Sequence, residues 1–291
     1  LSAKGANICV LDNLSSGRVD LLPQGVQFSY CDIRDYQKLS AILTKTSPDY
    51  IYNLAAHFAN QNSVDFPFQD IETNITGVVN ILEVAKKLTS LKKVVFASSS
   101  CVYGDNENMF EAAQVEPIET PYAINKFVGE LYAKYYARQF GVKTCTARIF
   151  NTYGPGELDG KYRNVIPNFI AKALRGEDIQ ITGTGKESRD FTYTDDTCAL
   201  LIKLAECEYK SGEVFNSGTG KETTIQDLVS KIVSLTNSSS DVVYAPKREW
   251  DGVDSRVSLI EQSKLRLDYK PRVSLDEGLD KTVEWFREQL A

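Results

Sequence analysis

Short apolar runs alternate along the chain with longer segments in which apolar residues recur every three or four positions. Each run has the length of a strand and is bounded by polar or turn residues, which is typical of buried strands. The predicted strands cover residues 7–11, 26–31, 50–56, 93–97 and 142–150. The periodic segments predict helices over residues 35–43, 67–89 and 121–141. This alternation predicts an α/β fold built on a doubly wound parallel sheet.

The carboxyl ends of these strands are the first place to look for a site. Crossover helices place the carboxyl ends of parallel strands at one edge of the sheet, where open α/β sheets bind ligands. Five residues of suitable chemistry stand at these ends: Asp12, Asp32, Ala55, Ser99 and Phe150. We therefore expect them to lie close together, although a serine at a strand end is also compatible with a plain loop.

Beyond residue 150 the alternation becomes looser. Turn-rich stretches and short apolar runs separate helical patterns, which are predicted over residues 164–175, 194–207, 224–235 and 275–289. We expect residues 1–150 to form a dinucleotide-binding domain. Residues 151–291 are expected to form a smaller C-terminal α/β lobe, interleaved with the last strands of the sheet.

The beginning of the chain resembles the inside of a βαβ unit. Residues 1–5 look like the last turn of a helix that stops at Gly5, and the next strand ends in Asp12. An acid at the end of the second strand of such a unit can bond both hydroxyls of an adenosine ribose. Its usual glycine-rich turn lies roughly 20 residues upstream. We therefore expect the first strand and glycine loop to be absent from the given chain, through truncation or disorder. A plain loop acid is the alternative interpretation of Asp12.

Composition narrows the class of protein. The 291 residues are 42% hydrophobic and 25% charged, as in ordinary globular proteins, and the net charge of −6 argues against nucleic-acid or anionic-membrane binding. Six cysteines without a C-x-x-C pair indicate reduced thiols in a cytoplasmic protein. No apolar run is long enough to span a membrane. The single histidine, His57, is expected in local structure or beside a substrate, and no metal site is predicted.

Tyr122 and Lys126 stand four residues apart on one predicted helix, so their side chains share a face. A nearby ammonium favours the phenolate and lowers the pKa of the tyrosine, which makes it a general base for an alcohol. Of the 15 tyrosines, only Tyr122 has a lysine four positions later. The spacing alone also fits an exposed helical face.

Other residues at the strand ends suit an adenine dinucleotide. The polar turn at residues 13–17 can continue the ribose contacts of Asp12. Asp32 can bond an adenine amino group while Ile33 covers the ring. Small side chains at residues 55–56 let a dinucleotide lie close to the backbone.

Eight short motifs occur in a specific order: D-N-L-S-S-G at 12–17, D-I at 32–33, N-L-A-A at 53–56, S-S-S at 98–100, Y-x-x-x-K at 122–126, R-I-F-N at 148–151, Y-G-P at 153–155 and R-D-F at 189–191. In kind, order and spacing they resemble the extended short-chain dehydrogenases/reductases, in the NAD-dependent nucleotide-sugar epimerase and dehydratase branch. The resemblance covers nearly the whole chain and implies a Rossmann fold, NAD as cofactor and a UDP-sugar as substrate.

The resemblance also implies roles for individual residues. Tyr122 is the acid/base, Lys126 holds the nicotinamide ribose, and Ser99 bonds the reacting hydroxyl. The residues implied to contact NAD are Asp12, Asn13, Ser15, Ser16, Gly17, Asp32, Ile33, Leu54, Ala55, Ala56, Asn74, Ala97, Tyr122, Lys126 and Phe150. The residues implied to contact the substrate are Ser99, Ser100, Asn151, Asn164, Val165, Arg189, Arg248, Asp251 and Ser255.

The residues after Ser99 bear on the reaction. Similar dehydratases carry Asp-Glu there, and similar decarboxylases carry a Glu at the second position, whereas this chain has Ser100 and Cys101. The expected reaction is therefore epimerisation at C4 through a transient 4-keto sugar. A dehydratase or decarboxylase that uses Cys101 is the alternative, and a non-catalytic dinucleotide-binding sensor is a second one.

The resemblance finally addresses the sugar and the assembly. Ser255, counted four residues on from Asp251, is implied to face the C2 substituent of the sugar. Its small side chain leaves room for an N-acetyl group, so a UDP-N-acetylhexosamine is expected beside a UDP-hexose. Similar proteins pair through two long helices, here residues 67–89 and 121–141, which implies a homodimer.

Overall fold

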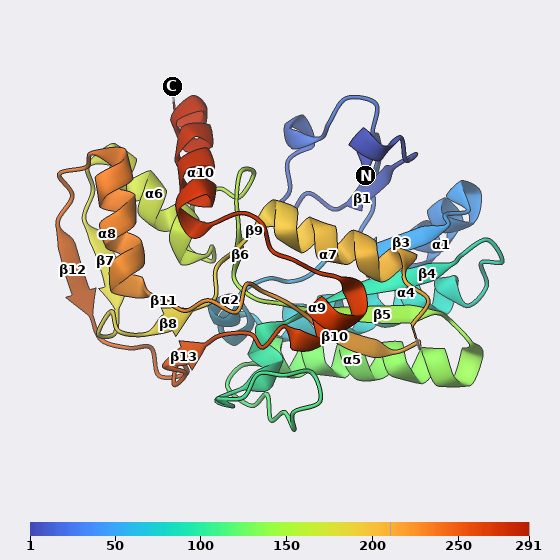
Figure 1. Cartoon of the computed structure of the whole chain (residues 1–291). Helices are drawn as coiled ribbons and strands as arrows, with labels where there is room; N and C mark the ends of the chain where they lie inside the picture. The colour runs from blue at the N-terminus through green and yellow to red at the C-terminus, as the bar shows by residue number, and fades with distance from the viewer. Residues whose placement is uncertain (210, 291) are drawn as a thin grey trace.

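A four-stranded parallel sheet forms the centre of the protein in the computed structural model, which describes residues 1–209 and 211–290 (Figure 1). Its strand order is β10-β5-β4-β3. The strands are β3 (Tyr50–Asn53), β4 (Lys93–Ser99), β5 (Thr144–Ile149) and β10 (Glu213–Ser217). Every residue of β4 is buried, which explains why this strand is apolar over most of its length.

Helices cover both faces of this sheet. Val94 and Phe96 of β4 pack with α4 (Val78–Ala85) and α5 (Pro121–Phe140). Val95 points to the opposite face and packs with α7 (Thr194–Glu206). Figure 1 shows α7 and α5 on opposite sides of the strands. The predicted α/β class and the doubly wound arrangement are therefore confirmed.

The first strands form a separate parallel pair, β1 (Cys9–Asp12) with β2 (Gln27–Tyr30). The helix α1 (Tyr36–Thr46) follows them and packs on α4. The structure therefore contains an early strand that ends at Asp12, as expected. The idea that a further strand and a glycine loop are missing is not shown by the structure and stays a prediction.

A second core lies in the C-terminal lobe, around the parallel pair of β7 (Ile179–Thr182) and β12 (Val242–Ala245). Three helices enclose it: α6 (Val165–Arg175), α8 (Ile225–Thr236) and α10 (Leu275–Leu290). The chain returns to the main sheet between these elements, with α7, β10 and α9 (Glu261–Leu267). This is the expected interleaving, while the boundary at residue 150 stays a prediction.

Very short strands connect the lobe to the edge of the sheet. The strand β8 (Ser188–Arg189) lies between β11 (Thr223–Thr224) and β13 (Ser255–Arg256). In addition, β6 (Thr152–Tyr153) pairs with β9 (Thr192–Tyr193). These strands carry two of the predicted substrate residues, Arg189 on β8 and Ser255 on β13.

The helix predicted over 67–89 differs from the structure. It consists of α3 (Pro67–Ile71), a π-helical segment (Glu72–Gly77) and α4, which ends at Ala85. A Cβ at Gly77 would lie 2.4 Å from Ile33 Cδ1, so the glycine permits close packing there. A short helix, α2 (Asn60–Asp65), also lies between β3 and α3, where no helix was predicted. Among the described helices, none has the length and apolar character needed to cross a membrane.

Candidate active site

A cavity of about 1120 Å³ runs along the carboxyl edge of the sheet and is lined by residues of both lobes. It brings together most of the predicted site residues. Those that line it are Asp12, Asn13, Ser15, Ser16, Asp32, Ile33, Leu54, Ala55, Ala56, Ala97, Ser99, Ser100, Tyr122, Lys126, Phe150, Asn151, Asn164, Val165, Arg189, Arg248 and Asp251. Three predicted residues do not line it: Gly17, Asn74 and Ser255.

The three predicted catalytic residues come from two adjacent elements. Ser99 ends β4, and its Oγ accepts a hydrogen bond from the backbone N–H of Cys101 at 3.2 Å. Tyr122 lies in the first turn of α5, and Lys126 lies one turn later. The ammonium of Lys126 donates to the carbonyl of Ala97 at 2.9 Å and lies 5.7 Å from the centre of the Tyr122 ring. Side chains of α5 and the end of β4 therefore meet at one wall of the cavity.

Local capping fixes the start of α5. Pro121 occupies the first turn, and the hydroxyl of Thr120 accepts the backbone N–H of Ala123 at 3.3 Å. The backbone N–H of Tyr122 donates to Ser63 Oγ at 3.0 Å. These contacts leave little freedom in where the phenol points.

Burial controls the ionisation of this pair. It raises the pKa of the Tyr122 phenol, and the side chains of Cys101 and Asp70 raise it further, while Ser99 acts in the opposite direction. Burial also lowers the pKa of Lys126 to about 8, against the opposing effect of Asp70. The prediction that the nearby ammonium lowers the pKa of Tyr122 was therefore wrong for this structure, because the cost of burying a phenolate is larger.

Asp70 is a fully buried carboxylate behind the predicted catalytic pair, and it was not among the residues predicted from the sequence. It accepts hydrogen bonds from Asn74 at 2.7 Å and from Asn125 at 2.5 Å. The amide of Asn74 also bonds both backbone groups of His57 at 3.0 Å. Asn74 therefore joins the segment at His57 to Asp70, and its predicted contact with the cofactor stays a prediction. An acid four residues before an amide, so that both lie on one face of the predicted helix, was the available signal.

The other end of the cavity fits the adenosine half of NAD. The carboxylate of Asp12 accepts the backbone N–H of Leu14 at 2.6 Å and retains acceptor capacity for ribose hydroxyls. A Cβ on Gly17 would lie 3.1 Å from both carboxylate oxygens, so glycine lets this turn close over Asp12. Asp32 is bonded by Arg34 at 2.8 Å and by Asn13 at 2.8 Å, and these contacts hold its pKa well below the usual range. Much of its bonding capacity is therefore already used.

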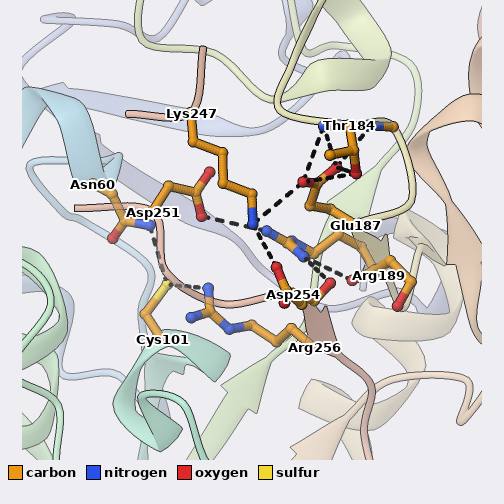
Figure 2. Close-up of polar contacts among 11 residues, drawn as sticks. Asn60, Cys101, Thr184, Glu187, Arg189, Lys247, Asp251, Asp254 and Arg256 are labelled. Atoms are coloured by element: carbon orange, nitrogen blue, oxygen red, sulfur yellow. Dashed lines mark hydrogen bonds and ion pairs between the residues drawn. The ribbon is translucent and has the colours of Figure 1, made fainter. Parts of the chain in front are cut away.

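The substrate side of the cavity carries positive charge (Figure 2). Arg189 lies on β8, with its Nη2 3.5 Å from a carboxylate oxygen of Asp251. Burial lowers the pKa of Arg189, and the neighbouring Arg256 contributes in the same direction. Arg248 lies over the ring of Trp250 at 5.5 Å, and the Trp250 indole N–H donates to Gln61 at 2.9 Å. This last bond joins the segment that carries Arg248 and Trp250 to Gln61 on α2.

Ser255 is not where the sequence placed it. Its hydroxyl lies 3.0 Å from that of Ser188, and the residue does not line the cavity. The next residue, Arg256, lines the cavity instead and is only 9% exposed. Successive residues of a strand point to opposite sides, so Arg256 faces the cavity and Ser255 does not, and the predicted role of Ser255 toward the sugar stays a prediction. Sequence reasoning missed Arg256.

Comparison with known proteins agrees with this geometry. The model of the NAD dependent epimerase/dehydratase family matches residues 1–218. The chain belongs to the NAD-dependent epimerase/dehydratase family. A curated UDP-N-acetyl-alpha-D-glucosaminuronate decarboxylase of Bacillus cytotoxicus is 33% identical over 304 residues, covering 99% of this chain and 92% of the relative.

Two solved structures are also similar. The epimerase Mth375 of Methanothermobacter thermautotrophicus has a TM-score of 0.96 and 39% identity, covering 99% of this chain and 87% of that one. The UDP-glucose 4-epimerase of Thermotoga maritima, solved with UDP-glucose, has a TM-score of 0.94 and 34% identity, covering 100% and 94%. NAD is accordingly the cofactor of this epimerase/dehydratase.

For an epimerase/dehydratase, the placement of acids in the cavity is informative. The acids in the described cavity wall are Asp12, Asp32, Glu157, Glu187 and Asp251. Two lie at the adenosine end, and the other three hold protein groups: Glu157 bonds Asn164, Glu187 bonds Thr184, and Asp251 pairs with Arg189. The segment beside Ser99 contributes Ser100 and Cys101 to the wall but no acid.

Proposed function

We propose that the protein interconverts the C4 epimers of a UDP-hexose or a UDP-N-acetylhexosamine, with NAD recycled in each turnover. The observation that carries this proposal is the burial of Tyr122 and Lys126 side by side, next to Ser99 at the end of β4. The cavity continues from these residues to Arg189 and Arg248, whose guanidinium groups suit a diphosphate.

Individual residues of the chain have separate roles in the proposed reaction. Ser99 orients the C4 hydroxyl, and Tyr122 takes its proton and later returns it. Lys126 bonds the ribose of the cofactor and adds a positive charge beside the phenol. Bound NAD supplies the hydride acceptor and, when oxidised, a second positive charge that favours the phenolate. Arg189 and Arg248 hold the substrate by its diphosphate, which leaves the sugar ring able to present its other face.

Epimerisation is favoured over dehydration because dehydration needs an added acid and base beside the keto sugar. In the part of the chain that the structure describes, Ser100 and Cys101 occupy the neighbouring wall, and a thiol is a poor substitute for a carboxyl. Decarboxylation is the second candidate, supported by the uronate decarboxylase among the relatives. A uronate oxidised at C4 is a β-keto acid, which can lose carbon dioxide without a second protein acid.

The deciding experiment is product identification. The protein with NAD is incubated with UDP-glucose, UDP-N-acetylglucosamine and their uronic acids, and the products are identified by proton NMR. A C4 epimer supports the proposal. A 4-keto-6-deoxy sugar contradicts it in favour of a dehydratase, and a decarboxylated pentose supports the second candidate. Bound NAD without any turnover indicates a non-catalytic sensor.

We also propose a homodimer that forms through α3, α4 and α5. Two of these helices, α3 and α5, expose large apolar side chains to solvent: Phe68 at 80%, Ile71 at 43%, Ile124 at 42%, Leu131 at 49% and Tyr135 at 49%. Such a surface is typical of an interface. Light scattering at micromolar concentration should give twice the mass of the chain, and Leu131→Arg should shift the protein to a monomer. A wild-type monomer contradicts the proposal.

A further inference from the structure

Arg256 is a buried cation that faces the cavity from β13 (Figure 2). It is 9% exposed, and its Nη1 lies 3.5 Å from the sulfur of Cys101. Its Nε is fully buried and has no hydrogen-bond partner among the described residues. A thiol is a weak acceptor, so most of the guanidinium fork has no protein partner in residues 1–209 and 211–290.

The carboxylates near Arg256 are committed to other cations. Asp251 pairs with Arg189 at 3.5 Å, and Asp254 pairs with Lys247. Glu187 lies 3.3 Å from the same lysine. Within the described chain, no carboxylate forms an ion pair with Arg256. A buried guanidinium without a counter-ion is unfavourable, so an anion from a ligand would complete this site.

The contact with Cys101 places Arg256 near the reacting end of the cavity. The backbone N–H of Cys101 bonds Ser99 Oγ at 3.2 Å, so the sulfur lies two residues from a predicted catalytic group. Arg189, which lies opposite Arg256 in the register of β8 and β13, is available for the diphosphate together with Arg248. The anion at Arg256 is therefore expected on the sugar ring.

We propose that Arg256 binds a carboxylate on the sugar, so that the hexose of the proposed substrate is a hexuronic acid linked to UDP. The guanidinium fork matches a planar carboxylate and can bond both of its oxygens. When a hexose presents C4 to Tyr122, the substituent on the adjacent C5 lies beside the reacting carbon, where a C6 carboxylate can reach the neighbourhood of Cys101. This inference rests on the proposed function for the placement of the sugar.

The test compares binding of three probes, UDP, UDP-glucose and UDP-glucuronic acid, to NAD-loaded protein by titration calorimetry. All proteins carry Tyr122→Phe, which prevents turnover during the titration. We expect UDP-glucuronic acid to bind about 10- to 100-fold more tightly than UDP-glucose. Adding Arg256→Met should erase this preference and leave the affinity for UDP unchanged. Arg189→Met, the matched control, should weaken all three probes by similar factors.

Two results would overturn the inference: equal affinity of the parent protein for both sugars, or an equal loss of UDP affinity in Arg256→Met, which would assign this arginine to the diphosphate. Arg256→Lys keeps the charge but not the fork, and it should show an intermediate preference. It serves as the test if Arg256→Met does not fold, as judged by circular dichroism. Failure of the proposed function looks different, because the NMR assay of the wild-type protein would then show no C4 epimer, whatever the binding preference between the two sugars.

Discussion

Two buried arginines show how differently the two regions of this molecule use positive charge. Arg148 lies on β5 in the sheet region and is 4% exposed. Its guanidinium bonds both carboxylate oxygens of Glu130 on α5, at 3.0 and 2.8 Å, and lies 4.6 Å from the ring centre of Tyr103. Arg256, on β13 in the C-terminal lobe, is 9% exposed and has no such carboxylate among the described residues.

The comparison separates a structural charge from a binding charge. Burial alone lowers the pKa of Arg148, but the hydrogen bond and charge of Glu130 outweigh it and leave the pKa above its ordinary value. Arg148 does not line the cavity, whereas Arg256 does. The sheet region therefore satisfies its own charges, while the lobe leaves a cation for the ligand to satisfy. Unpaired buried charge in a cleft is a recognised mark of a functional site.

The largest expected effect concerns the chemistry of the sheet region. Tyr122→Phe removes the proton acceptor and should lower turnover by about 10²- to 10⁴-fold, while UDP, held by the lobe, binds as before. Turnover is measured by NMR and UDP affinity by calorimetry. Tyr135→Phe, on the exposed side of the same helix, is the matched control and should keep full activity. Normal turnover in Tyr122→Phe would contradict the assignment of the chemistry to the sheet region and of UDP binding to the C-terminal lobe.

The next effect tests the structural arginine. Arg148→Met leaves the carboxylate of Glu130 buried without its partner and should lower the free energy of unfolding by about 3–5 kcal/mol. Urea unfolding measures this change. The double variant with Glu130→Gln removes the stranded charge and should recover part of the loss. A single-variant loss below about 1 kcal/mol would contradict the view that the sheet region depends on this pair.

The contrast between the sheet region and the C-terminal lobe also explains which features could be predicted from the sequence. Long regular elements carry the predicted catalytic groups: β4 is a seven-residue strand that ends in Ser99, and α5 holds Tyr122 and Lys126 at helical spacing. The strand and helix patterns of these two elements can be recognised in the amino-acid sequence. The parallel topology of the sheet then places the two elements together. In the lobe, β13 has only two residues, so no alternating pattern exists to reveal which of Ser255 and Arg256 faces the cavity.

Other features depend on burial, which a single sequence does not display. Asp70 becomes important because α3 and α5 bury it against Asn74 and Asn125, from segments far apart in the chain. The ionisation of Tyr122 was predicted from its neighbour at helical spacing, but desolvation by the whole surrounding core decides its direction. The spacing of residues in a helix predicts which side chains are neighbours. The pKa of a side chain depends in addition on how far the surrounding protein removes it from water.

A smaller effect concerns the pH dependence of stability in the protein without cofactor. Burial lowers the pKa of Lys126 to about 8 from 10.5. Between these values the unfolded chain binds more protons than the folded one, so stability rises with pH. From about pH 7.5 to about pH 9.5, this residue should add about 1–2 kcal/mol to the free energy of unfolding. Urea unfolding at both values should show the rise in the wild type, and Lys126→Met should lack that part. An equal rise in both proteins would show that other groups cause it.

The smallest effect is the most direct test of the comparison between the two arginines. Arg256→Met removes a buried cation that has no carboxylate partner in the described chain, and it strands no opposite charge. The free energy of unfolding should therefore change by less than about 1 kcal/mol or even increase, in contrast to Arg148→Met. Urea unfolding of both variants under one condition makes the measurement.

Saturating UDP-glucuronic acid should raise the free energy of unfolding of the wild type more than that of Arg256→Met, because the ligand supplies the missing anion only where the cation remains. If Arg256→Met lowers the free energy of unfolding as much as Arg148→Met does, both arginines are structural. The C-terminal lobe then has no unpaired cation that a ligand could bind.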